Sequence, residues 1–222
     1  MLLLALDTST SAVTVALHDG SRVLAEATTV DPRAHVERLA PNIRAVLSAA
    51  GARPGEVTDV VAGVGPGPFT GLRVGLVTAR VFAFAVGATL RGVGSLDALA
   101  AGIAPMPAEL LVASDARRKE VYWARYAGTG PSVTRVDGPA VAKPADLPLG
   151  LRELPTAGRG PVLYPDLFPR PVAPLDVSAA TLATLAVARL AAGDPLDAIE
   201  PLYLRRPDAA PSATAAVTSA LR

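Results

Sequence analysis

The order of the apolar segments in the first half of the chain restricts its fold more than any other feature. Three strand-like runs follow one another within residues 2–30, and Asp19-Gly20, a pair typical of hairpin turns, joins the second to the third. From residue 35 to residue 103, helical and strand-like periods alternate. Three strands in series followed by alternating helices and strands predict an α/β fold.

Local signals mark where several elements begin and end. A helix is expected over residues 35–50, with Pro41 kinking or splitting it because proline lacks a backbone donor. Gly51 should end that helix. A second helix is expected over residues 70–86, and Ser95 should cap the N-terminus of a short third one.

The second half of the chain begins with a similar but weaker pattern. Residues 109–127 indicate strand, charged turn and strand, and residues 132–138 a third strand. The segment 139–174 is rich in proline and glycine, which predicts loops around one or two short strands. A last helix is expected between Ser178, as its N-cap, and Gly193.

This order of elements is similar to the ribonuclease H-like fold, a unit that actin-like ATPases (the ASKHA superfamily) carry twice. We expect an actin-like α/β fold of two ribonuclease H-like units, the second truncated. Residues 1–105 would form the first unit and residues 106–206 a smaller second one. The remainder, 207–222, is Ala, Pro, Ser and Thr-rich and is expected to be disordered.

Composition and charge exclude several classes of protein. The 222 residues carry a formal net charge of +1, which gives no bulk attraction to nucleic acid or to an anionic membrane. The absence of cysteine excludes disulfides and thiolate metal sites. The helix over 70–86 carries Arg73 and Arg80 and is expected to be too short to span a bilayer. With no basic signal-peptide region at the N-terminus, the sequence predicts a soluble cytoplasmic protein.

The stretch "GVGPGPFTGLRVG", residues 63–75, resembles a phosphate-binding loop but fits neither familiar pattern. It has no lysine, which a Walker-type loop needs, and Pro68 stands where a dinucleotide fingerprint needs its third glycine. Two interpretations stay open. The glycines allow either tight packing of a strand against a helix, or the approach of an anion to the helix N-terminus.

The polar turn after the first strand, "DTSTS", also has two interpretations. In actin-like kinases an Asp here positions hydrated Mg²⁺ and the following hydroxyls touch phosphate, which makes Asp7, Thr8, Ser9 and Thr10 candidate remains of a nucleotide site. Alternatively, the hydroxyls cap their own backbone in a hairpin turn.

No metal site and no activated nucleophile can be identified. A helical metal pair needs two histidines four residues apart, and in "HVERL" the partner position of His35 is occupied by Leu39. His35 is then expected to be a capping or surface group. Nothing marks one serine as activated, so no catalytic residue is assigned.

The segment "DARRKEVYW", residues 115–123, places five charged residues in one turn. One interpretation is a salt-bridged hairpin tip, with Val121 and Trp123 on one face of the following strand and Tyr122 and Tyr126 on the other. The other is a polar docking or ligand surface.

Four motifs in one order, "LALDTST", "GVGPGPFTGLRVG", "DARRKEVYW" and "PLYLR", closely resemble the bacterial TsaB family, also called YeaZ. "AHVERLAPNI" is a fifth, looser match. The resemblance extends from Leu2 to about Arg206. One departure is Pro68, where the family usually has Ser, and this removes a hydroxyl and a backbone donor from the turn.

The resemblance implies a pseudo-enzyme, a shortened paralogue of the tRNA threonylcarbamoyltransferase TsaD whose second metal histidine is replaced by Leu39. Such proteins pair with TsaD and, with the ATPase TsaE, support transfer of threonylcarbamoyl to the adenosine beside the anticodon of tRNAs that read A-starting codons. The resemblance implies docking through the N-terminal half and self-association through a similar surface. It implies no intrinsic cofactor. It leaves open whether ATP or ADP binds at the interface of the complex, and whether this chain contacts tRNA directly.

The helix over 70–86 is apolar almost all round, so one face should cover the sheet and another could meet a partner. Small residues at 71, 75, 79 and 83 would let a second helix approach closely. A fully buried helix is the alternative. The candidate partner-contact residues are Leu39, Ile43, Leu72, Leu76, Ala79, Arg80 and Ala83.

Two other functions remain open at this point. A stand-alone actin-like ATPase or small-metabolite kinase would need an adenosine loop, which the second half does not show. A metallopeptidase-like protein would need the missing second histidine of "HVERL".

Overall fold

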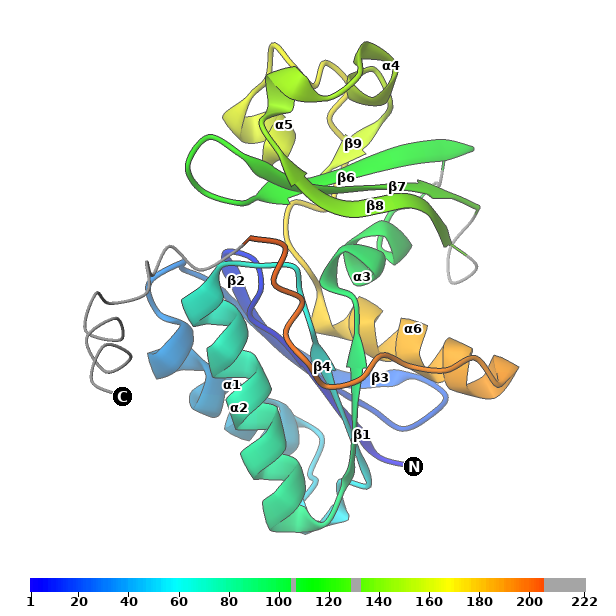
Figure 1. Cartoon of the computed structure of the whole chain (residues 1–222). Helices are drawn as coiled ribbons and strands as arrows, with labels where there is room; N and C mark the ends of the chain where they lie inside the picture. Colours follow the sequence, from blue (N-terminus) through cyan, green and yellow to red (C-terminus); the bar gives the residue numbers. More distant parts are fainter. Residues whose placement is uncertain (105–106, 129–132, 206–222) are drawn as a thin grey trace, which may run out of the picture.

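A computed structural model gives the arrangement of residues 1–104, 107–128 and 133–205 (Figure 1). The chain forms two lobes, each built on its own sheet. The predicted boundary at 105/106 and the predicted tail, 207–222, lie outside the described residues.

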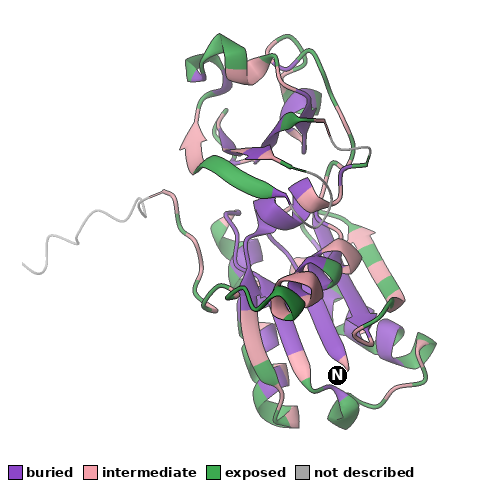
Figure 2. Ribbon diagram, turned by 90° about the vertical axis from the view of Figure 1, so that its right-hand side faces the viewer, coloured by how far each residue is buried: buried purple, intermediate pink, exposed green. Residues whose placement is uncertain are grey.

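The N-terminal lobe contains a five-stranded sheet in the order β3-β2-β1-β4-β5. The first three strands are antiparallel, and β4 and β5 run parallel to β1. The strands β1 and β2 are buried along their whole length, and they form the centre of the lobe (Figure 2). The bounds are β1 (Leu3–Asp7), β2 (Ala12–His18), β3 (Val23–Val30), β4 (Asp59–Gly63) and β5 (Thr89–Val93).

Helices cover both faces of this sheet. The helices α1 (His35–Ala49) and α2 (Phe69–Val86) pack on one face, where they share a core with β1, β2 and β4. The opposite face is covered by α3 (Ser95–Ala101) and α6 (Ala179–Ala192). The sheet is therefore the middle layer of three.

The C-terminal lobe has a four-stranded sheet in the order β8-β7-β6-β9. One face shares the core of α3 and α6, and the other packs on a small cluster that includes Phe168 and Leu147. The bounds are β6 (Glu109–Asp115), β7 (Val121–Ala127), β8 (Thr134–Ala142), β9 (Thr156–Ala157), α4 (Leu149–Arg152) and α5 (Gly160–Leu163), with 3₁₀ turns at η1 (Pro54–Glu56) and η3 (Pro144–Asp146).

The end of the described chain returns to the N-terminal lobe and does not stay in the second unit predicted over 106–206. Helix α6 packs on β1 and β2 because its apolar side covers the second face of that sheet. The segment 194–205 then runs along β5 and α2: Asp197 pairs with Gly92, and Leu202 N–H donates to the Val64 carbonyl at 2.8 Å.

Asp97 at the start of α3 connects the lobes. Its carboxylate accepts hydrogen bonds from Tyr126 Oη at 2.7 Å, Arg135 at 3.2 Å and Arg189 at 3.1 Å. These partners come from β7, β8 and α6, so one carboxylate holds three other elements. Burial, together with the Asp97 charge, raises the pKa of Tyr126 well above its usual value.

Most predicted elements are confirmed, including the hairpin at residues 19–20 and Ser178 as an N-cap, whose side chain accepts from Thr181 N–H. Helix α1 is not split at Pro41, because this proline removes only one hydrogen bond from a helix held by its buried face. The cap of α3 was predicted wrongly. Gly94, not Ser95, is the N-cap of α3, because the Ser95 side chain is used elsewhere.

We expect Asp97→Ala to lower the free energy of unfolding by on the order of 2 kcal/mol, because it leaves a buried hydroxyl and two guanidinium groups without their acceptor. Glu109→Ala is the matched control, since Glu109 pairs with Arg125 at an exposed position and should contribute less than about 1 kcal/mol. Urea unfolding of both variants measures the difference, and equal losses would contradict the assignment.

Candidate functional site

Asp7, at the end of β1, is fully buried and bonded within the chain. Its Oδ1 accepts hydrogen bonds from Ser9 N–H and Ser9 Oγ, both at 2.7 Å. Its Oδ2 accepts from Ser95 Oγ at 2.6 Å. Both carboxylate oxygens are thus used by neighbouring side chains and backbone of the same lobe.

The surroundings of Asp7 leave little space beside it. A side chain at Gly63 would overlap the Asp7 carboxylate, so β4 lies directly against it. Burial raises the pKa of Asp7, and the hydrogen bonds from Ser95 and Ser9 lower it by less. The carboxyl group acts here as a link between β1, β4 and α3.

The other three residues of the predicted nucleotide-site remnant border a cavity between the lobes. This cavity, which we call the interlobe cavity, has a volume of about 260 Å³. Its walls are the turn after β1, the N-terminal turn of α2, the start of α1 and residues of the C-terminal lobe. The polar residues that line it are Thr8, Ser9, Thr10, Ser11, Arg33, His35, Thr70, Ser114, Asp115, Arg117, Arg159 and Asp176.

The charges in the interlobe cavity are largely paired already. Arg159 donates two hydrogen bonds to Asp176, at 2.8 and 2.5 Å, and the pKa of Arg159 is raised by this bonding. Arg117 forms an ion pair with Asp115 at 3.0 Å. The chain's own carboxylates therefore occupy the positions that a bound anion would take at two of the three arginines.

The glycines of residues 63–75 serve close packing of α2 against the turn after β1. A Cβ at Gly67 or Gly71 would lie 2.6 Å from the carbonyl oxygen of Ser9 or Thr8, respectively. Thr8 Oγ1 donates to the Gly71 carbonyl at 2.7 Å, and a side chain at Gly75 would overlap Thr8 Oγ1. Of the two interpretations of this stretch, the geometry favours the packing one.

Gly75→Ala should destabilise the fold by about 1–3 kcal/mol, because the added methyl group overlaps the Thr8 hydroxyl in a closely packed contact. Gly55→Ala is the control, since nothing lies within 4 Å of a Cβ there. Thermal unfolding of both variants should show a lower midpoint for Gly75→Ala alone; an unchanged midpoint would rule out the packing role.

Both histidines bond to backbone atoms. His35 Nε2 lies 3.0 Å from the Thr10 carbonyl oxygen, and Gly20 N–H donates to His18 Nδ1 at 2.9 Å. Burial lowers the pKa of His18. Over residues 1–104, 107–128 and 133–205, no group of three His, Asp or Glu side chains is placed to hold a metal ion.

The structure places most of the predicted partner-contact residues inside the core. Six side chains pack between α1, α2 and the sheet: Leu39, Ile43, Leu72, Leu76, Ala79 and Ala83. The small residues of α2 let this helix approach the sheet, and they are not available to a second helix. Arg80 is exposed, and its guanidinium donates to the Ile199 carbonyl at 2.6 Å.

A different face of α2 is exposed and apolar. Val77, Val81 and Phe84 are 59%, 62% and 90% exposed, and their spacing puts them on one side of the helix. We call these three residues the α2 apolar face. The uniform hydrophobicity of the helix hid this face in the sequence. The sequence signal that could have revealed this face is the spacing of its large apolar residues, three to four positions apart.

Helix α2 is also the one helix in the described part of the chain that is long and apolar enough to cross a membrane, by length and composition alone. It has 18 residues, so the expectation that it is too short was wrong. Such a helix is weak evidence for a membrane span, because core helices of soluble proteins pass the same test, and one side of α2 packs on the sheet.

Comparisons with known proteins identify relatives over nearly the whole chain. The family model described as TsaD, tRNA N6-adenosine threonylcarbamoyltransferase, matches residues 22–221. The protein named tRNA threonylcarbamoyladenosine biosynthesis protein TsaB in Escherichia coli is 33% identical over 174 residues, which is 75% of each chain. An uncharacterised protein of Mycobacterium leprae is 43% identical over 95% of this chain, which spans 56% of that longer protein.

A solved structure shows the same fold. YeaZ from Pseudomonas aeruginosa superimposes with a TM-score of 0.79 at 31% sequence identity, over 91% of this chain and 99% of that one. The two-sheet α/β architecture predicted from the order of elements is thereby confirmed.

Proposed function

Because the chain belongs to the bacterial TsaB (YeaZ) family of tRNA threonylcarbamoyladenosine biosynthesis proteins, we propose that it acts there as the non-catalytic partner of TsaD. In this role it would stabilise or activate TsaD during threonylcarbamoyl transfer to the adenosine beside the anticodon of tRNAs that read A-starting codons. TsaE would join the same complex. The proposal includes a cytoplasmic location.

The observation that carries this proposal is the α2 apolar face. Isolated exposed apolar residues are common, but three large ones on one side of a helix that otherwise packs on the sheet suit a protein partner. The lack of acidic residues on α2, and the presence of Arg73 and Arg80 beside the apolar face, suit a partner surface with carboxylates at its rim. A second copy of this chain would dock on the same face when TsaD is absent.

The interior of the molecule supports a non-catalytic role. An actin-like ATPase or kinase needs a carboxylate directed at Mg²⁺, and the corresponding Asp7 is bonded to Ser9 and Ser95 instead. Two of the three arginines that line the interlobe cavity, Arg117 and Arg159, are paired with the chain's own carboxylates. In the proposal, ATP or ADP therefore binds at the interface with the partner and not in the interlobe cavity.

Val81→Arg tests the docking surface. The side chain is exposed, so the fold should tolerate the change, whereas a charge at the centre of an apolar contact should weaken binding to the cognate TsaD at least thirtyfold, about 2 kcal/mol. Analytical size exclusion of the mixed proteins, together with calorimetric titration, measures the loss.

Val162→Arg is the matched control for this experiment. Val162 lies in α5 of the C-terminal lobe and is 58% exposed, so the same substitution there should leave TsaD binding unchanged. Equal affinity of Val81→Arg and wild type would refute the α2 apolar face as the docking surface.

A further inference from the structure

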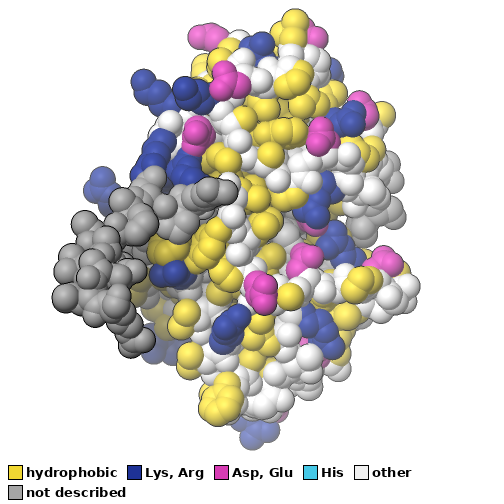
Figure 3. All heavy atoms as spheres, viewed as in Figure 1, with side chains coloured by type: hydrophobic (Ala, Val, Ile, Leu, Met, Phe, Trp, Pro, Cys, Tyr) yellow, Lys and Arg dark blue, Asp and Glu magenta, His cyan; other side chains and the backbone are white. Residues whose placement is uncertain are grey.

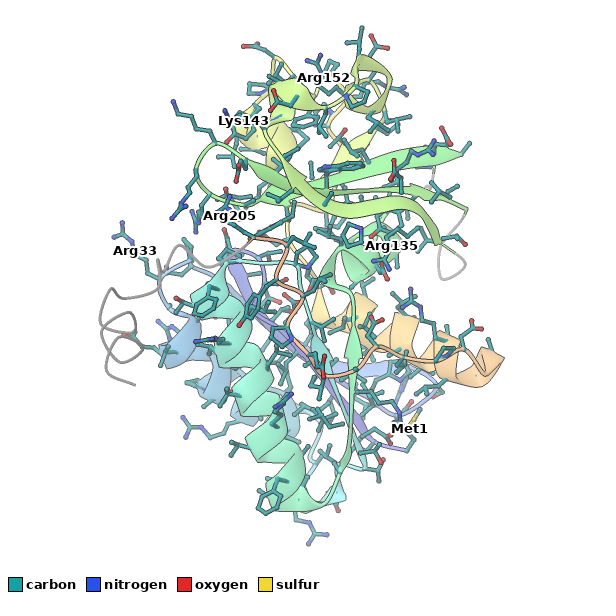
Figure 4. The ribbon with its side chains drawn as sticks, viewed as in Figure 1. Met1, Arg33, Arg135, Lys143, Arg152 and Arg205 are labelled. Carbon is teal, nitrogen blue, oxygen red and sulfur yellow. The ribbon has the colours of Figure 1, made fainter. Side chains whose placement is uncertain are left out.

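The glycine-rich stretch, the hairpin and the last described residues meet around one cavity, which we call the motif cavity. Its volume is about 430 Å³. In Figure 4, Arg205, one of the residues that line it, lies between the two lobes. Hydrophobic and aromatic side chains make up much of the wall: Pro68, Phe69, Ala116, Tyr122, Tyr203 and Leu204. This wall suits an apolar ligand.

The arginines that line the motif cavity already have partners. Arg117 forms an ion pair with Asp115 at 3.0 Å, and Arg205 pairs with Glu120. Arg118, the third arginine of the wall, is not free either. Since these cations are engaged, the cavity gains little from an anion, and its apolar surface is what remains available to a ligand.

Two stacked aromatic rings form the exposed edge of the cavity. Phe69 and Tyr203 are 47% and 38% exposed, and their ring centroids are 5.1 Å apart. Arg73 fixes this pair: its guanidinium lies 3.6 Å from the Phe69 ring centroid and donates to Tyr203 Oη at 2.9 Å. Aromatic residues and arginine are enriched at the centres of protein interfaces, so this edge suits contact with another protein chain.

The motif cavity lies at one end of the α2 apolar face. Phe69 begins α2 and lines the cavity, and Arg73, Val77, Val81 and Phe84 follow it on the same side of the helix. Figure 3 shows hydrophobic side chains down the surface over α2, below the level where the lobes meet. Phe84 comes 15 residues after Phe69, which corresponds to about 22 Å along a helix. One end of the face is therefore hollow, and the other carries a ring that is 90% exposed.

The spacing of the hollow and the ring fits a pair of antiparallel α2 helices. When two copies of α2 pack about a twofold axis beside Val77, residue 84 of one copy lies opposite residue 70 of the other, because each is seven positions from the centre. Thr70 directly follows Phe69, which lines the cavity. Each Phe84 ring then reaches the motif cavity of the other copy, and the symmetry forms both contacts at once.

We propose that the motif cavity receives the Phe84 ring of a second copy of this chain. This rests on the proposed docking of a second copy on the α2 apolar face, and it adds the group that is bound and the cavity that binds it. A projecting aromatic side chain in a pocket with apolar walls is typical of the residues that dominate binding between proteins.

The cations of this face do not oppose the pairing of two copies. Arg73 donates to Tyr203 Oη, and Arg80 donates to the Ile199 carbonyl, so both guanidinium groups are held by the chain that carries them. In the antiparallel arrangement Arg73 lies opposite Val81 of the second copy, which places an apolar side chain against the stem of the arginine.

Photocrosslinking tests the contact directly. The chain is made with p-benzoylphenylalanine in place of Phe84, which keeps an aromatic ring at this position, and is irradiated at a concentration where it is dimeric. We expect a covalent dimer whose crosslink, located by mass spectrometry, lies in the wall of the motif cavity, at residues 67–69, 116–118 or 203–205. The same group in place of Val162, an exposed residue of α5, is the control and should give no covalent dimer.

Light scattering over a concentration series measures the dissociation constant of the dimer. Phe84→Ala and Tyr203→Ala, which remove the bound ring and one ring of the wall, should each raise this constant at least about tenfold. Leu149→Ala removes an exposed apolar side chain of α4 that does not line the cavity, and it should leave the constant unchanged. Thermal midpoints establish that each variant is folded.

Three results would overturn the proposal. One is a wild-type chain that stays monomeric at about 1 mM. Another is a crosslink from position 84 to α2 of the second copy beyond residue 70, which would indicate a different pairing of the helices. The third is an unchanged dissociation constant in Phe84→Ala or Tyr203→Ala. Because all of these measurements use the chain alone, their failure is distinguishable from a failure to bind TsaD, which is measured with Val81→Arg.

Discussion

The close contact between α2 and the turn after β1 is the constraint on which the rest of the structure depends. It is possible only because Gly67, Gly71 and Gly75 have no side chains where Ser9 and Thr8 lie. The contact fixes the rotation of α2, so that its small residues face the sheet and Val77, Val81 and Phe84 face outward. It also places the start of α2 in the wall of the interlobe cavity.

Most charges in the interlobe cavity are balanced within the chain. In the interlobe cavity, arginines from the C-terminal lobe are paired with Asp115 and Asp176, which also line it, and the neighbouring Asp7 is fully bonded to Ser9 and Ser95. The polar groups that an actin-like enzyme would direct at a ligand are thus used to hold this chain together.

The sequence predicted the order of elements well, because turn signals such as Asp19-Gly20 and caps such as Ser178 act locally. Prediction from the sequence failed where contacts between distant residues determine the orientation of a helix or the role of a side chain. The rotation of α2 could not be read from a helix that is apolar on all sides, and Ser95 was assigned as a cap although Asp7, 88 positions away, takes its hydrogen bond. The Pro/Gly-rich segment 139–174 did not indicate the short helix α5. The pattern of the last helix did not show that α6 packs on the sheet of the N-terminal lobe.

The measurement that tests the central claim most directly is reconstituted threonylcarbamoylation of a tRNA that reads an A-starting codon. Cognate TsaD, TsaE, threonylcarbamoyl-adenylate and ATP would be combined with wild-type chain, without it, or with Val77→Arg. The account predicts modification with the wild type, and the same low level with Val77→Arg as without the chain. Full modification in the absence of this chain, or undiminished modification with Val77→Arg, would contradict it.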